Sequence, residues 1–181
     1  MMTQRPPVPS VAAEIARRFE GPAGRALLID KLRNQYILEN NNDVVNLLID
    51  KAKLKFFEPD DIIIKQGETD TDVLFIIVGR VVLFKNEIEV ERQVPGSVIG
   101  EIGAVDAESY RSVTIKASEP TVVASVSQAD FNLIADKYPF LWKRLAIEIS
   151  DRLRRRETLQ PRRIKARVFI VERISVDSRG A

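Results

Sequence analysis

Short runs of β-branched residues, separated by turn residues, fill the middle of this 181-residue chain. The runs are residues 62–64, 73–78, 81–84, 88–90, 113–116 and 122–126. Turn-forming residues, among them Gly67, Gly79 and the pair Pro95-Gly96, lie between the runs. Many short strands at regular spacing are typical of a closed antiparallel fold. The pattern therefore predicts a jelly-roll β-barrel within an α+β protein, rather than a parallel sheet.

Helical patterns precede the predicted barrel. Ser10 is placed to cap a helix that starts at the next residue. A second pattern covers residues 25–38 and has apolar residues at four-residue spacing. Asn42 or Asp43 is placed to cap a third helix. We therefore expect a helical N-terminal region over residues 1–53.

Helical patterns also follow the predicted barrel. Ser127 is placed to cap one helix, and Pro139 interrupts it because proline disfavours helix at the residue before it. A longer helix is predicted over residues 140–156, with an apolar stripe on one face. Barrel and C-terminal helices together give a predicted domain over residues 54–156.

Two residue types are missing from the whole sequence. There is no Cys and no His, which excludes disulfides, thiolate or histidine metal sites, cysteine nucleophiles and histidine-based triads. No paired set of carboxylates stands out either, so we expect no enzymatic activity, no metal and no cofactor in this chain. Lys and Arg number 28 and Asp and Glu 26, which gives no broad electrostatic case for nucleic acid. No apolar run is long enough for a membrane span, and no apolar signal core is present, so a cytoplasmic location without membrane contact is expected.

One segment among the strands carries groups suited to an anion. Gly100 allows a close backbone approach, because it has no Cβ atom. Arg111 offers a permanently charged fork of N–H donors that fits phosphate oxygens. Glu101 would repel a phosphate, but it can accept a hydrogen bond from a neighbouring hydroxyl. These groups together favour a sugar with an attached phosphate.

The same segment resembles the phosphate-binding cassette of the cyclic nucleotide-binding domain family. Residues 62–68 and 74–81 resemble the strands that precede the cassette in that family, and the resemblance extends over about residues 54–156. It implies that Glu101 binds the ribose 2′-hydroxyl and that Arg111 binds the cyclic phosphate. The ligand-binding residues that it implies are Gly100, Glu101, Ile102, Arg111, Ser112, Val113 and Thr114. Backbone amides of this set would contact the phosphate, and Val113 or Thr114 would lie near the base. The helix after the barrel acts as a lid in the family.

The cassette departs from the family pattern in several places. Gly103 and Ala104 stand where Ala-Leu is usual, Tyr110 stands where Pro is frequent, and Val113 is bulkier than the usual residue. The phosphate-binding groups are unaffected. The preferred base is left open by these departures.

The last part of the chain suggests what the cassette controls. Residues 157–181 read as a basic linker and the start of a truncated downstream domain. Residues 165–171 resemble the opening strand of TIR-like effector domains. In Pycsar anti-phage systems such effectors sense cyclic pyrimidine mononucleotides and degrade NAD. This resemblance implies a sensor for cyclic UMP or cyclic CMP that switches a TIR-like effector.

Other readings stay open at this point. A cyclic AMP- or cyclic GMP-binding domain of a transcription factor, a kinase or a channel would share the same cassette. A homodimer is also predicted, because the apolar helical faces exceed what one small barrel needs. The residues of those faces are Leu28, Leu32, Leu47, Leu48, Leu145, Ile149 and Leu153.

Overall fold

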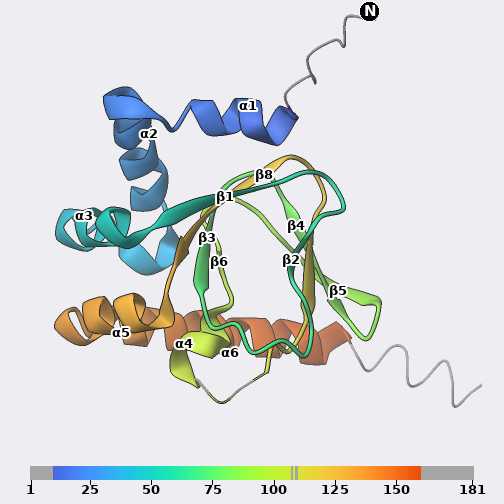
Figure 1. Ribbon diagram of the computed structural model, residues 1–181. Coiled ribbons are helices and arrows are strands. Elements are labelled where there is room, and N and C mark those ends of the chain that lie inside the picture. The colour runs from blue at the N-terminus through green and yellow to red at the C-terminus, as the bar shows by residue number, and fades with distance from the viewer. Residues whose placement is uncertain (1–9, 107, 109, 160–181) are drawn as a thin grey trace, which may run out of the picture. The chain divides into compact units, whose positions relative to one another are not determined.

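The computed structural model describes residues 10–106, 108 and 110–159 (Figure 1). The chain divides into two compact units, residues 1–145 and 146–181. The resemblance to a TIR domain at residues 165–171 lies outside the described residues. The predicted domain boundaries after residues 53 and 156 stay predictions.

Two four-stranded antiparallel sheets form the barrel (Figure 1). The first has the order β1 (Lys53–Phe57), β8 (Thr121–Val126), β3 (Val73–Val78) and β6 (Val98–Ile99). The second has the order β2 (Ile62–Ile64), β7 (Thr114–Ala117), β4 (Val81–Lys85) and β5 (Ile88–Gln93). The predicted jelly-roll fold is confirmed. The sequence pattern did not predict β1, because its lysines interrupt the apolar residues, or β6, because it is only two residues long.

The core of the barrel is built from β-branched and leucine side chains of both sheets. Its buried members are Ile64, Leu74, Ile76, Val81, Leu83, Ile99, Val113, Ile115 and Val123. Burial of such a side chain contributes roughly 1.5–3 kcal/mol. This core holds in place the strand ends from which the cassette emerges.

The N-terminal helices are α1 (Val11–Arg17), α2 (Gly21–Arg33), the 3₁₀ turn η1 (Tyr36–Leu38) and α3 (Asn42–Lys51). The cap at Ser10 is confirmed, because its Oγ accepts a hydrogen bond from the Ala13 N–H at 3.1 Å. The second helix lies earlier in the chain than the predicted residues 25–38, because it begins at Gly21 and ends at Arg33. Residues 36–38 form the separate turn η1 instead, and Glu39 and Asn40 follow in positive-φ conformations that no helix can continue through.

The third helix begins with a different cap from the predicted one. Asn41, rather than Asn42 or Asp43, caps α3, and its Oδ1 accepts from the Val44 N–H at 3.1 Å. Three neighbouring residues of similar capping propensity give the sequence no means to choose among them.

The short helix α4 (Glu101–Val105) lies between β6 and β7, and the C-terminal helices are α5 (Gln128–Lys137) and α6 (Phe140–Leu159). The Ser127 cap is confirmed, since its Oγ accepts from the Asp130 N–H at 3.1 Å. α6 continues three residues past the predicted end at 156. Within the first unit, α4 lies beside α5 and β3 (Figure 1). In the part of the chain that the structure describes, no helix has both the length and the apolar character needed to cross a bilayer.

Candidate functional site

Gly100 links β6 to α4 in a conformation that suits glycine. Its φ and ψ are 76° and 9°, in the left-handed region. A Cβ atom at this position would lie 2.6 Å from both Arg111 Nη1 and the backbone oxygen of Asp72. Glycine is therefore required here both by the backbone conformation and by the closeness of its neighbours.

Arg111 is held against Gly100 from the other end of the cassette. Its backbone pairs with the turn after β2: the Arg111 N–H donates to the Glu68 carbonyl at 2.8 Å, and the Gly67 N–H donates to the Arg111 carbonyl at 2.9 Å. The guanidinium donates through Nη1 to the Gly100 carbonyl at 3.0 Å, and through Nη2 to the Asp72 carbonyl at 2.8 Å. These contacts fix a cation that is only 6% exposed.

One donor of this buried cation has no partner. Arg111 Nε is buried and makes no hydrogen bond to any residue that the structure describes. An unsatisfied buried donor costs about 1–3 kcal/mol, and more when it is charged. An anionic oxygen placed at Nε would remove that cost and form a charge-assisted hydrogen bond. The cassette thus presents a fixed positive group with an available donor beside a glycine backbone.

Asp70 forms an ion pair with this cation. Its Oδ2 lies 3.2 Å from Arg111 Nη2. Partial burial raises the pKa of Asp70, but the hydrogen bond from the Asp72 N–H and the hydrogen bond and charge of Arg111 outweigh it. The pKa of Asp70 therefore lies below its usual range. Asp70 neutralises part of the Arg111 charge while it holds the guanidinium in place.

The loop that carries Asp70 is itself anchored to the barrel. The Asp72 carboxylate accepts from the Ser125 hydroxyl at 2.6 Å and lies 3.2 Å from Lys55 Nζ. Ser125 is buried on β8. Sequence reasoning missed both aspartates, because 41 and 39 residues separate them from Arg111 and no local pattern marks them.

The structure locates the other predicted site residues in different environments. Glu101 is 6% exposed in the first turn of α4, Ile102 next to it is half-buried, and Ser112 is exposed. Val113 belongs to the barrel core. Thr114 opens β7, and its Oγ1 accepts from the Gln66 N–H at 3.0 Å. The cassette thus brings Gly100 and Arg111 into direct contact. The other candidates are their neighbours in the sequence: residues 101–102 follow Gly100, and residues 112–114 follow Arg111.

The unusual Gly103 has a physical reason in this fold. A Cβ atom there would lie 3.1 Å from Thr71 Cα, 3.3 Å from the Thr71 carbonyl oxygen and 3.4 Å from Arg111 Nη1. The loop over residues 70–72 packs so closely on α4 that even alanine would crowd it. Glycine at 103 is therefore matched to the aspartate loop that holds Arg111.

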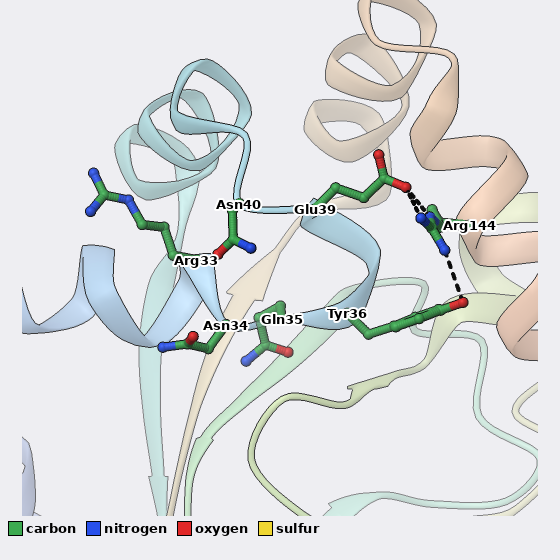
Figure 2. A pocket seen from close by; sticks show the side chains of 7 residues that line it. All are labelled: Arg33, Asn34, Gln35, Tyr36, Glu39, Asn40 and Arg144. Atoms are coloured by element: carbon green, nitrogen blue, oxygen red, sulfur yellow. Dashed lines mark hydrogen bonds and ion pairs between the residues drawn. The ribbon is translucent and has the colours of Figure 1, made fainter.

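A separate hollow lies among the N-terminal helices and shares no residue with the cassette. Its lining residues are Arg33, Asn34, Gln35, Tyr36, Glu39, Asn40 and Arg144 (Figure 2). Figure 2 shows Arg144 reaching both Glu39 and Tyr36. Arg144 pairs with the Glu39 carboxylate, donates to the Tyr36 hydroxyl at 3.0 Å and stacks over its ring at 5.1 Å. These contacts join η1 to the first turns of α6.

Comparisons with known proteins identify the family of this domain. Residues 54–138 match the model of the cyclic nucleotide-binding domain family. The chain is 34% identical to the Pycsar effector protein BcPycTIR of Burkholderia cepacia over 85% of its own length and 51% of that protein. It is 36% identical to PaPycTIR of Pseudomonas aeruginosa over 85% of its length and 50% of that protein. The chain thus spans about half the length of these curated relatives.

Solved structures support the fold. The cyclic AMP-bound structure titled PfPKA-R (141-441) superposes with a TM-score of 0.68 at 21% identity, over 81% of this chain and 49% of that one. The catabolite activator protein of Thermus thermophilus gives 0.60 at 22% identity, over 66% of this chain and 59% of that one. Residues 54–138 therefore belong to the cyclic nucleotide-binding domain family, and the chain is similar to the Pycsar TIR effectors.

Proposed function

We propose that this chain is the sensor part of a Pycsar TIR-type effector, and that its cassette binds a 3′,5′-cyclic mononucleotide, cyclic UMP or cyclic CMP. The observation that carries the binding proposal is the buried Arg111 guanidinium with an unpartnered Nε–H beside Gly100. A cyclic phosphate supplies the acceptor and the negative charge that this donor lacks. Glu101 is assigned to the ribose 2′-hydroxyl, and Thr114 to the neighbourhood of the base.

The pyrimidine preference and the effector are supported by similarity. The Pycsar TIR effectors of two organisms are similar to this chain over most of its length. The unusual Gly103 and Tyr110 also set this cassette apart from the family pattern. In the proposal, the TIR-like domain degrades NAD once the sensor is occupied, because ligand binds the active arrangement more tightly than the inactive one.

A thermal-shift panel with cyclic AMP, GMP, UMP and CMP tests the ligand. Ligand that binds only the folded state stabilises it by about 2.7 kcal/mol at a concentration 100 times its Kd. The largest shift is expected from cyclic UMP or cyclic CMP. The largest shift from cyclic AMP or cyclic GMP would favour the alternative, a regulatory domain of a transcription factor, kinase or channel. No shift with any of them would end the binding proposal.

Calorimetry on variants of Arg111 and Glu101 tests the residue assignments. Arg111→Ala should lose about 2–5 kcal/mol of binding free energy, as expected when one partner of a buried charge pair is removed. Arg111→Lys keeps the positive charge but removes the planar set of guanidinium N–H donors. Arg92→Ala, at an exposed arginine, serves as the matched control. Glu101→Ala should weaken the ribonucleotide far more than its 2′-deoxy analogue. Equal weakening of both would contradict the hydroxyl assignment.

The link to an effector is tested on the longer parent protein. We expect NAD cleavage only when cyclic UMP or cyclic CMP is added, and none from this 181-residue chain. A parent that binds DNA through a helix-turn-helix and leaves NAD intact would replace the TIR assignment with a transcription factor.

The homodimer stays part of the proposal, but the structure narrows its possible interface. Leu28, Leu32 and Leu48 are buried within the chain itself and are therefore not available to a partner. Leu145 is buried as well, whereas Leu47 and Ile149 are half-buried and Leu153 on α6 is 54% exposed, so these last three residues remain as possible interface residues. Light scattering over a range of protein concentrations decides it, and a constant monomer mass would exclude the dimer.

A further inference from the structure

The carbonyl end of the cassette helix α4 receives hydrogen bonds from α5. The last carbonyls of any helix lack partners within it, and α4 has only five residues. Gln128 Nε2 donates to the Gly103 carbonyl at 2.6 Å. The Asn132 amide also lies against α4: if its oxygen and nitrogen are exchanged so that both face suitable partners, Nδ2 donates to the Ala104 carbonyl at 3.2 Å and to the Gln128 carbonyl at 3.3 Å. Gln128 and Asn132 are four residues apart, which puts them on one face of α5.

The helix α5, which carries these two amides, is held in place by packing of its buried face. Phe131 is fully buried, and its ring lies 6.5 Å from that of Phe75 on β3 and 6.0 Å from that of Trp142. Ser127 caps the start of the helix. The backbone that presents the two amides is thus held in place by packing on the barrel core.

Gly103 connects this support to the phosphate-binding arginine. Its carbonyl accepts from Gln128, while a Cβ atom at this position would meet Thr71 and Arg111 Nη1 within 3.4 Å. Release of the carbonyl would free α4 to move away from the loop at 70–72. Gly100, at the start of α4, would then lose its fixed geometry, and with it the carbonyl that accepts from Arg111 Nη1.

We propose that Gln128 and Asn132 are positioning residues that hold α4 in its ligand-binding geometry before the ligand arrives. This inference rests on the proposed function of the cassette, because it concerns the cost of ordering that site. Without the amide pair, part of the binding free energy is spent on ordering α4, so affinity falls although no ligand contact is removed. By linkage, the ligand stabilises the same two hydrogen bonds to an equal extent.

The test uses variants that remove the donors and keep the helix. Gln128→Glu has the same size and suits the start of α5, but it puts a carboxylate oxygen where a donor is needed. Asn132→Asp does the same at the second position, and Leu133→Met, at an exposed site of the same helix, is the control. The cyclic mononucleotides AMP, GMP, UMP and CMP are each titrated by calorimetry. Loss of one hydrogen bond of about 0.5–1.5 kcal/mol corresponds to roughly 2–13-fold weaker binding in each single variant.

Hydrogen exchange separates positioning from general destabilisation. In the ligand-free variants, the amides of residues 101–105 should exchange faster, while those of α5 and the barrel keep the wild-type rates. Saturating ligand should remove the difference. Unchanged affinity in both variants, or faster exchange spread over the whole domain, would overturn the inference. If the wild-type protein binds none of the four nucleotides, the proposed function itself is wrong. If a variant fails to fold, the side-chain amide NMR signals of Gln128 and Asn132 in the wild type decide it: unchanged signals on ligand addition would count against the coupling.

Discussion

Replacing Gly100 by alanine tests whether the contact between the cassette glycine and Arg111 is as close as the structure shows. The left-handed backbone, with φ at 76°, costs an alanine about 1–2 kcal/mol. Its Cβ would also lie 2.6 Å from the Asp72 carbonyl oxygen, a backbone atom that cannot rotate away. Overpacking of this kind costs typically about 1–3 kcal/mol. We expect Gly100→Ala to lower the free energy of unfolding by about 2–5 kcal/mol, the sum of these terms.

Gly21→Ala is the matched control for this variant. Gly21 also has a positive φ, 65°, but a Cβ there meets no atom within 4 Å. Both variants restrict the unfolded chain equally, so this contribution cancels in the comparison. Urea denaturation followed by circular dichroism gives both free energies. The Gly100 variant should lose about 1–3 kcal/mol more than the control, which is the packing part alone. Equal losses would refute the close contact with Asp72 and Arg111.

Two further predictions concern the residues around Arg111, and a third concerns the separate hollow at Arg144. Gly103→Ala should give a net loss of stability in the same urea titration, because Thr71 crowds its Cβ at 3.1 Å; a net gain would show that the aspartate loop moves aside. The pKa of Asp70 is lowered in the folded state, so its ion pair with Arg111 stabilises the protein above about pH 4, and this contribution is lost as pH falls through the folded pKa. The free energy of unfolding of Asp70→Asn should therefore fall less steeply than that of the wild type as the pH drops through the folded pKa of Asp70. The same pH dependence in both proteins would contradict the ion pair. Arg144→Gln should lower the melting temperature, and the decrease should be smaller in 1 M salt, because Glu39 and Arg144 are partly exposed to solvent. A decrease that does not depend on salt would show that the stabilisation comes from the Tyr36 contacts and not from the ion pair.

Local features of this protein could be predicted from the sequence, because their causes act within a few residues. β-branched runs marked six of the eight strands, since such side chains fit a pleated and half-buried surface. Ser10 and Ser127 were recognised as caps, because a cap bonds an N–H only three residues ahead. Gly100, Glu101 and Arg111 were marked as candidates through their resemblance to a family cassette. The short β6 and the lysine-rich β1 were missed because their pairing, not their composition, makes them strands.

The surroundings of the candidate site were decided by tertiary structure alone. β3 pairs with β6 so that Leu74 lies opposite Ile99, and this register brings the loop at 70–72 beside Gly100. The carboxylate of Asp70 then meets an arginine 41 residues away, and Gln128 meets a carbonyl 25 residues away. Strand register depends on the whole hydrophobic pattern of both partners, and no single segment encodes it. The sequence thus marked the residues of the cassette, and the packing of distant loops and helices determined how Arg111 and α4 are held.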